Sequence, residues 1–265
     1  MRGYRRAYMA KCAEADTLVG EVYDAMVELG LADDTYFVFA SDHGEMAMEH
    51  QDWSKMSLYE ASVRVPLVIT GPGIAAEQRV QSLVSLIDLC PTLMDMAGLP
   101  RRDGLDGQSL LPTAMGEANS LRDSAFACHT GCTVNTSAFM WRQDRWKYVF
   151  YTGLPAQLFD LQDDPDELHD LAEDRPDVIE RLHAALQDTV NCDQVHRDWQ
   201  DYCKNAFRQW RRQAKRGLYV DDKYALQDNP SSDYWAIMDN CFTGYDEHDE
   251  TKVEQWLAGD WARIA

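Results

Sequence analysis

The rest of the chain is best understood from one stretch, Ser41-Asp-His-Gly-Glu-Met-Ala-Met-Glu-His-Gln-Asp-Trp-Ser-Lys-Met-Ser-Leu-Tyr59. It follows Tyr36–Ala40, a short apolar run of β-branched and aromatic residues that is typical of a buried parallel strand. In open α/β sheets, ligands bind in the crevice beyond the carboxyl ends of the strands, and Gly44 would let the chain turn sharply there. The sequence therefore predicts that Asp42 and His43 lie side by side in a ligand-binding crevice.

Composition narrows the class of protein and its partners. The chain has 265 residues, of which 45% are hydrophobic, which is enough for a substantial core. A formal net charge of −20 argues against nucleic acid and against an anionic membrane surface as partners. No apolar run reaches the roughly 20 residues of a membrane span, and the first residues do not form a signal peptide, so the localisation stays open. The 7 cysteines include no Cys-x-x-Cys pair, which gives no indication of a zinc site.

Helical and strand patterns alternate in the first part of the chain. Apolar spacing predicts a helix over Ala7–Gly30, a second strand at Val65–Thr70 and a further helix over Ser85–Gly98. A helix that leads straight into a buried strand needs partner strands that normally come from earlier sequence, so the chain is expected to begin in mid-fold. The turn-rich segment Arg101–Ser120 predicts a boundary, with residues 1–120 forming part of an α/β core.

Residues 121–265 are predicted to form a smaller α+β lobe. Four short segments have strand-like composition and predict a small antiparallel sheet: Ala125–His129, Ser137–Arg142, Trp146–Tyr151 and Gln157–Leu161. Asp177–Val190 has one apolar face and is expected to be a helix packed against that sheet. Beyond residue 190, tryptophan and tyrosine residues are scattered among charges, and we expect short helices that wrap the lobe.

Asp42 and His43 are the candidate metal ligands. A hard cation such as calcium prefers carboxylate oxygens, and an imidazole is tolerated where an oxygen-rich cage leaves a position. Two adjacent ligands do not complete a site, and an Asp-His-Gly turn can equally be a loop stabilised by the aspartate side chain. Both interpretations remain open from these residues alone.

Lys55, His50 and His129 are the candidate groups for substrate binding and proton transfer. Lys55 can bind an anionic oxygen or protonate a leaving group, and His50 can carry a proton near neutral pH. The simpler interpretation is that both pair with nearby carboxylates on the surface. His129 can reach the crevice from the second lobe, whereas metal binding with Cys128 and Cys132 would be an incomplete zinc set.

In their order along the chain, several motifs resemble the C-terminal half of a sulfatase of the alkaline-phosphatase superfamily, from about Tyr8 to Asp188. These are Ser-Asp-His-Gly-Glu at 41–45, Glu-His at 49–50, Lys-Met-Ser-Leu-Tyr-Glu at 55–60, Val-Pro-Leu at 65–67, Gly-Pro-Gly at 71–73, Asp-Leu-Cys-Pro-Thr-Leu at 88–93, Gly-Gln-Ser-Leu-Leu at 107–111 and the tract around Leu-Phe-Asp-Leu at 158–161. The motifs Ala-Met-Glu-His and Lys-Met-Ser, with His129-Thr-Gly-Cys132, are most similar to the arylsulfatase K branch, whose family substrate is a 2-sulfated glucuronate.

The resemblance implies an alkaline-phosphatase-like α/β sandwich with a mostly parallel sheet, present here in part, and a smaller C-terminal antiparallel lobe with helices. It implies that Asp42 and His43 are calcium ligands and that Lys55 contacts the sulfate of a sulfated sugar. The family nucleophile is a formylglycine made from the cysteine of a Cys-x-Pro-Ser-Arg motif, and Cys90-Pro-Thr is only a partial match.

The chain is therefore expected to be inactive alone, with an N-terminal half as its partner. The alternatives are a metal-dependent phosphatase or phosphodiesterase of the same superfamily, and a noncatalytic binding or assembly partner.

Overall fold

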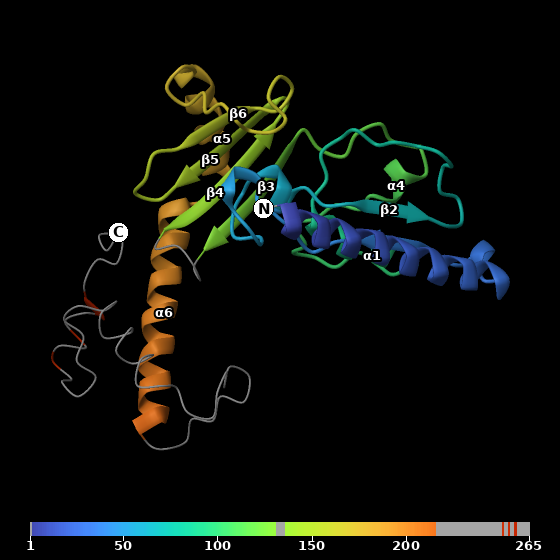
Figure 1. Cartoon of the computed structure of the whole chain (residues 1–265), viewed down its shortest axis with the longest axis horizontal. Coiled ribbons are helices and arrows are strands. Elements are labelled where there is room, and N and C mark those ends of the chain that lie inside the picture. Colours follow the sequence, from blue (N-terminus) through green and yellow to red (C-terminus); the bar gives the residue numbers. More distant parts are fainter. Residues whose placement is uncertain (1, 131–135, 216–250, 252–253, 255–256, 259–265) are drawn as a thin grey trace. The chain divides into compact units, whose positions relative to one another are not determined.

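The computed structural model describes residues 2–130, 136–215, 251, 254 and 257–258 (Figure 1). The chain forms two compact units. The first contains residues 1–129 and 138–190, and the second contains residues 130–137 and 191–265. These units are defined by which residues pack together, whereas the boundary predicted near residue 120 was based on a turn-rich segment. The two definitions do not test each other, and the boundary stays a prediction.

The elements follow one another with short connections. The helices are α1 (Arg2–Glu28), α2 (Glu60–Val63), α3 (Leu89–Met96), α4 (Leu111–Ala114), α5 (Pro176–Thr189) and α6 (Cys192–Lys215), with short 3-10 turns η1 (Ala32–Asp34), η2 (Glu49–Gln51) and η3 (Leu86–Asp88). The strands are β1 (Phe37–Ala40), β2 (Leu67–Thr70), β3 (Ser124–Thr130), β4 (Ser137–Gln143), β5 (Trp146–Tyr151) and β6 (Gln157–Asp160).

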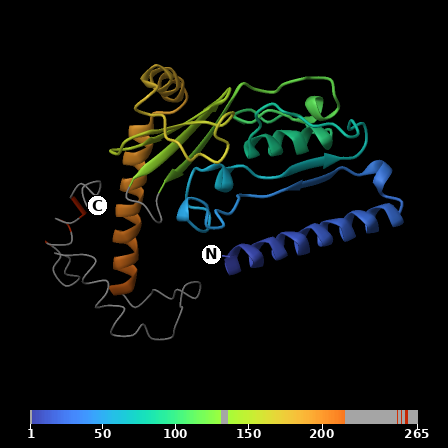
Figure 2. The same ribbon diagram turned by 45° about the horizontal axis from the view of Figure 1, so that its top comes forward.

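The two strands predicted before and after the Asp-His-Gly stretch are present as β1 and β2. They pair with each other in antiparallel direction, with Phe37 opposite Thr70, so the parallel arrangement expected for this strand is wrong for the described pair. The strand is also half-buried rather than fully buried. An apolar run indicates that both faces of a strand are covered but does not specify the direction of its neighbour. Helix α1 runs along this pair in both views (Figures 1 and 2), and its Tyr23 ring meets Phe37 edge-on at 5.5 Å between centroids.

One buried carboxylate holds the segment around α3. The helix predicted over Ser85–Gly98 is present as η3 followed by α3. Asp88 is 0% exposed and accepts hydrogen bonds from the backbone amides of Ser85 at 2.8 Å and Gln108 at 2.9 Å, and it pairs with Arg122. A Cβ atom at Gly107 would lie 2.1 Å from a backbone oxygen of η3, so that position requires glycine. The Asp-Leu-Cys-Pro-Thr and Gly-Gln-Ser motifs are therefore structural partners.

The predicted antiparallel sheet is confirmed in the order β3-β4-β5-β6, with β4–β5 and β5–β6 antiparallel. Because side chains alternate along a strand, β5 presents one set of residues to α5 and another set to the segment before α2. Tyr148 and Phe150 contact His183 of α5, which confirms the helix predicted to pack on the sheet. Val149 faces the other way and packs with Leu58, which precedes α2.

Helix α6 differs from the prediction of short helices after residue 190. It is one continuous helix of 24 residues. Its apolar positions, such as Val195 and Trp199, do recur at helical spacing, but the many charges between them conceal this period in the sequence. Among the described helices, none has the length and apolar character needed to cross a membrane.

Candidate functional site

The Asp-His-Gly turn begins directly after β1 and fixes the orientation of the His43 ring. The His43 backbone amide donates to Asp42 Oδ1 at 3.0 Å. The ring atom Nδ1 lies 2.8 Å from the carbonyl oxygen of Gly44, which can only accept a hydrogen bond. Nδ1 therefore carries the proton, and the lone pair of the neutral ring is on Nε2. This backbone contact is how metal-binding histidines are commonly oriented in proteins.

Asp42, His43 and Lys55 come together as predicted. Lys55 Nζ lies 2.5 Å from His43 Nε2, and Asp42 Oδ2 lies 3.5 Å from the same nitrogen. The Asp42 side chain is 84% exposed and the His43 side chain 38% exposed, so the group is open to solvent on the described part of the chain. A carboxylate, an imidazole lone pair and an ammonium group within one turn and one loop can together attract a cation and an anion.

Helix α2 positions both halves of this group through one serine. The Gly44 amide donates to the Ser62 carbonyl at 2.7 Å, and the Ser62 hydroxyl donates to the Lys55 carbonyl at 2.6 Å. Ser62 is only 3% exposed. A Cβ atom at Gly44 would lie 2.0 Å from the Ala61 carbonyl oxygen, so the turn can approach α2 only as glycine. Sequence reasoning missed Ser62, because a serine in a short helix gives no signal of its own.

Glu45 closes the loop between His43 and Lys55. Its Oε1 accepts hydrogen bonds from the Ser54 amide at 2.6 Å, the Ala47 amide at 3.2 Å and the Tyr4 hydroxyl of α1 at 2.8 Å. Burial alone would raise the pKa of the Glu45 carboxyl, but these three hydrogen bonds outweigh it and hold the pKa below its ordinary value. The carboxylate is therefore a structural acceptor. Five non-glycine residues of this loop adopt positive φ, namely Ala47, Met48, His50, Gln51 and Ser54.

The structure places the His50 ring against Tyr59 and His129 on β3. The His50 ring stacks on Tyr59 with 3.8 Å between centroids and 6° between planes. His129 lies half-buried on β3. Among the described residues, no hydrogen bond, ion pair or ring contact connects either histidine to Lys55 or the Asp-His pair. Their substrate and proton-transfer roles stay predictions, and the suggested thiol partner Cys132 lies outside the described residues.

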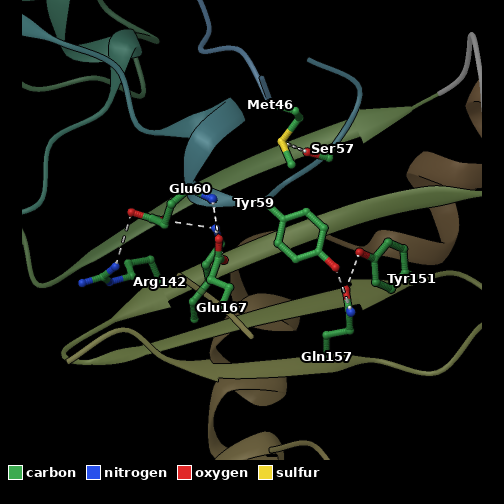
Figure 3. A network of polar contacts seen from close by, with 9 residues as sticks. Met46, Ser57, Tyr59, Glu60, Arg142, Tyr151, Gln157 and Glu167 are labelled. Carbon is green, nitrogen blue, oxygen red and sulfur yellow. Dashed lines mark hydrogen bonds and ion pairs between the residues drawn. The ribbon is translucent and has the colours of Figure 1, made fainter. Parts of the chain in front are cut away.

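A buried ion-pair network connects α2 to the four-stranded sheet. Lys147 of β5 is 0% exposed, and its Nζ lies 2.7 Å from Glu167 and 3.1 Å from Glu60 at the start of α2. Glu167 also accepts the Glu60 backbone amide at 2.6 Å, and Arg142 lies 3.9 Å from the Glu60 carboxylate (Figure 3). Sequence reasoning missed this network. The available signal was a lysine in a strand whose other residues are aromatic or apolar.

Tyrosine and glutamine side chains continue the contact beside this network. Gln157 Nε2 donates to the Tyr59 hydroxyl at 3.3 Å, and the Tyr151 hydroxyl donates to Gln157 Oε1 at 2.8 Å (Figure 3). Burial raises the pKa of Tyr151 to about 12. Tyr59, which stacks on His50, is thus hydrogen-bonded to β6 of the sheet.

The donor set of the Asp-His pair fits part of a metal site. Carboxylate oxygen and an imidazole nitrogen are acceptable ligands for a hard divalent cation, which would have to displace Lys55 Nζ from its 2.5 Å contact with His43 Nε2. Within the described ranges, no group of three or more His, Cys, Asp and Glu side chains has the geometry to hold a metal ion. Further oxygen ligands would therefore have to come from outside this group.

Comparisons with known proteins give the class of the chain. Residues 2–99 match the family model for Sulfatase. These residues contain the Asp-His-Gly turn, Lys55 and α2, so the candidate site lies within the part of the chain that matches a sulfatase domain. It is similar to arylsulfatase K of Gallus gallus, with 41% identity over 221 residues that cover 80% of this chain and 41% of the relative. Arylsulfatase K of Homo sapiens is 39% identical over 222 residues, covering 80% of this chain and 41% of the relative.

Solved structures confirm the α/β fold class. A 2-O GAG sulfatase matches with a TM-score of 0.67 and 27% identity, over 83% of this chain and 46% of that protein. A phosphonate monoester hydrolase of Silicibacter pomeroyi matches with a TM-score of 0.61 and 30% identity, over 66% of this chain and 38% of that protein. The chain thus spans about two fifths of the length of the curated relatives it matches.

Proposed function

We propose that this chain forms part of a calcium-dependent sulfatase and supplies one side of its site for the sulfate ester. The observation that carries the proposal is the meeting of His43 Nε2 and Lys55 Nζ at 2.5 Å beside the Asp42 carboxylate. A sulfate group needs positive charge close to it, and an overall charge of −20 disfavours anions at long range. Local cationic groups at this position would overcome that repulsion.

Asp42 and His43 would hold the metal. Their side chains offer carboxylate oxygen and the Nε2 lone pair, from which a bound ion would displace the Lys55 ammonium, while the Gly44 carbonyl keeps the ring in the required tautomer. A bound calcium ion would supply positive charge that neutralises sulfate oxygens. The acidic ligands that complete the cage, and the formylglycine of the family, are expected outside the motifs found in this chain.

Lys55 would bind a sulfate oxygen with its ammonium group. The hydrogen bond from Ser62 to the Lys55 carbonyl fixes its backbone relative to the Asp-His-Gly turn, so the ammonium starts from a defined position. His50 is proposed to move a proton, and His129 to contact the substrate. Both roles rest on residue type and on the family resemblance.

The proposed substrate is a sulfated sugar, with glucuronate 2-sulfate as the specific candidate. Support comes from the similarity to arylsulfatase K and to a solved 2-O GAG sulfatase. The chain alone is proposed to be inactive, because it contains no Cys-x-Pro-Ser-Arg motif for the nucleophile. Incubation with calcium and an aryl sulfate tests this point, and turnover by the chain alone would contradict it.

The metal role is tested by calcium titration of the full chain, followed by NMR of the labelled histidine side chains. Since two protein ligands give a weak site, we expect the His43 ring signals to shift at about millimolar calcium. Asp42→Asn should abolish that shift, whereas Asp33→Asn, at an exposed position in η1, should preserve it. His43 signals that do not respond to calcium, or that respond equally in Asp42→Asn, would refute the metal role.

The comparisons do not favour the phosphatase alternative, because the curated relatives reported above are arylsulfatases. The solved phosphonate monoester hydrolase shares the fold with this chain. An enzyme reassembled from this chain and the complementary region of a relative distinguishes the two. Faster hydrolysis of sulfate esters than of phosphate esters is expected, and the reverse preference would support the alternative.

A further inference from the structure

The first turns of helix α1 carry a cluster of positive charge in an otherwise acidic chain. Residues 2–12 include Arg2, Arg5, Arg6 and Lys11 but no aspartate or glutamate, whereas the whole chain has a formal net charge of −20. Cationic side chains are unfavourable at the N-terminal end of a helix, because the helix dipole already places positive charge there. Helix stability therefore does not explain the composition of this segment.

Three of these cations lie together on one side of the helix. At 3.6 residues per turn, Arg5, Arg2 and Arg6 occupy a continuous arc of about 100° around the axis, and all three are exposed. Lys11 lies on the opposite side, where its Nζ is 2.6 Å from Glu14. Among the described residues, no carboxylate forms an ion pair with any of the three arginines. We call these three residues the arginine cluster.

The arginine cluster is anchored beside the candidate site. Helix α1 runs antiparallel to β1, so its first turn lies at the end of β1 where the Asp-His-Gly turn begins (Figure 2). Arg5 Nε donates to the Ala47 carbonyl at 2.7 Å, and the Tyr4 hydroxyl donates to Glu45 Oε1 at 2.8 Å. Both acceptors belong to the loop between the Asp-His-Gly turn and Lys55. The cluster and the proposed sulfate-binding lysine are therefore attached to the same loop.

We propose that the arginine cluster binds a second anionic group of a sulfated sugar, such as the carboxylate of a uronate, while Lys55 binds the sulfate. Guanidinium groups suit this role, because they bind planar and tetrahedral oxyanions through paired hydrogen bonds. Arg5 uses only Nε for its bond to the loop, so its two terminal nitrogens can also bind an anion. The inference rests on the proposed function and adds a preference for sugars with two anionic groups.

The charge of the rest of the chain favours a short ligand over a long polyanion. At physiological ionic strength the Debye length is about 8 Å, so a single sugar senses mainly the charges of the arginine cluster and the site. Nucleic acid or an anionic membrane surface would extend over the acidic remainder of the chain and would be repelled by it. A small dianion that fits beside the site loop is therefore the expected occupant.

The test compares two ligands by NMR of the full chain with labelled histidine and arginine side chains. Glucuronate 2-sulfate has a carboxylate and a sulfate, whereas an aryl sulfate has a single anionic group. With glucuronate 2-sulfate, we expect both the His43 ring signals and the Arg6 Nε signal to shift. The double variant Arg2→Gln, Arg6→Gln should raise the dissociation constant measured at His43 at least threefold, and Arg6→Gln alone should have an intermediate effect. The dissociation constant of the aryl sulfate should stay unchanged in both variants.

The matched control is Lys11→Gln, which removes one positive charge from the same helix, as Arg6→Gln does. Because Lys11 lies on the opposite side, this control should leave the dissociation constant of glucuronate 2-sulfate unchanged. Circular dichroism and urea unfolding should show that the arginine variants stay folded, since the substituted side chains are exposed and are unfavourable to the helix.

Three results would overturn the proposal: an unchanged dissociation constant in the double variant, an equal loss in Lys11→Gln and Arg6→Gln, or an equal loss for the two ligands. In each of these cases a His43 response to the ligands would still leave the proposed function standing. If His43 responds to neither ligand, the proposed function fails, and the second anion site fails with it.

Discussion

At the scale of single residues, Gly44 decides whether the candidate metal ligands can be placed. The amide of this glycine bonds to Ser62, and its missing side chain lets the Asp-His turn contact the end of α2. The proximity of Asp42, His43 and Lys55 could be predicted from the sequence. Asp42 and His43 are adjacent, and the short loop that follows limits how far Lys55 can lie from them. The sequence could not identify Ser62, because the contact depends on how α2 packs and not on any local pattern.

Substitution of Gly44 by alanine should destabilise the fold and disturb the site together. The new Cβ atom would lie 2.0 Å from the Ala61 carbonyl oxygen, which is backbone and cannot rotate away. We expect a loss of at least about 2 kcal/mol in the free energy of unfolding, in the range of overpacking, and a shift of the His43 NMR signals. In contrast, Gly20→Ala in α1 meets no atom within 4 Å and should stabilise by about 0.5–1 kcal/mol. Equal effects of the two substitutions would contradict this role of Gly44.

Ionisation of Tyr151 should make the free energy of unfolding depend on pH in alkaline solution. Burial raises its pKa to about 12 from the ordinary 10.0, so the folded state favours the neutral phenol. The resulting stabilisation is fully present below pH 10.0, the ordinary pKa, and is lost as the pH rises towards about 12. Urea unfolding across this range should show the decline. Tyr151→Phe should lose about 1 kcal/mol at neutral pH, through the bond to Gln157, but should show a smaller alkaline decline. An unchanged decline in this variant would exclude Tyr151 as its source.

At the scale of elements, the sheet and α2 are joined by charges as well as by apolar packing. Leu58 packs on Val149, and two residues away from each of these positions Glu60 meets Lys147 on the same face of β5. Since α2 also holds Gly44 and Lys55, residues of the sheet contribute indirectly to the arrangement of the site. The composition of Trp146–Tyr151 predicted the strand correctly, but composition does not tell which face receives a buried lysine.

Replacing Lys147 by methionine should therefore be costly. It leaves the Glu60 and Glu167 carboxylates without their buried partner, and breaking a buried ion pair from one side typically costs about 3–5 kcal/mol. Urea denaturation measures the loss. Lys11→Met is the control, because that lysine is 77% exposed in its pair with Glu14, and it should change stability by less than about 0.5 kcal/mol. The triple variant that also carries Glu60→Gln and Glu167→Gln should recover part of the loss. If it recovers none, the unpaired carboxylates are not the cause.

At the scale of the whole molecule, the order of motifs was more informative than any element boundary. That order predicted a resemblance to sulfatases, which the family-model match over residues 2–99 and the similarity to Gallus gallus arylsulfatase K confirm. The antiparallel pairing of β1 with β2 could not be predicted, because an apolar strand has the same composition in either direction. The continuous α6 was missed since charged residues interrupt its apolar spacing.

The hydrogen bonds of Asp88 also have a practical use. Because the Asp88 carboxylate accepts a hydrogen bond from the Gln108 amide, it joins the two ends of the polypeptide from residue 88 to residue 108, and Arg101–Gly104 within that span are exposed. An affinity epitope inserted between Arg102 and Asp103 would thus be anchored at its base and accessible to an antibody. Such a tagged form would allow immobilisation of the protein for capture experiments with both chain termini left unmodified.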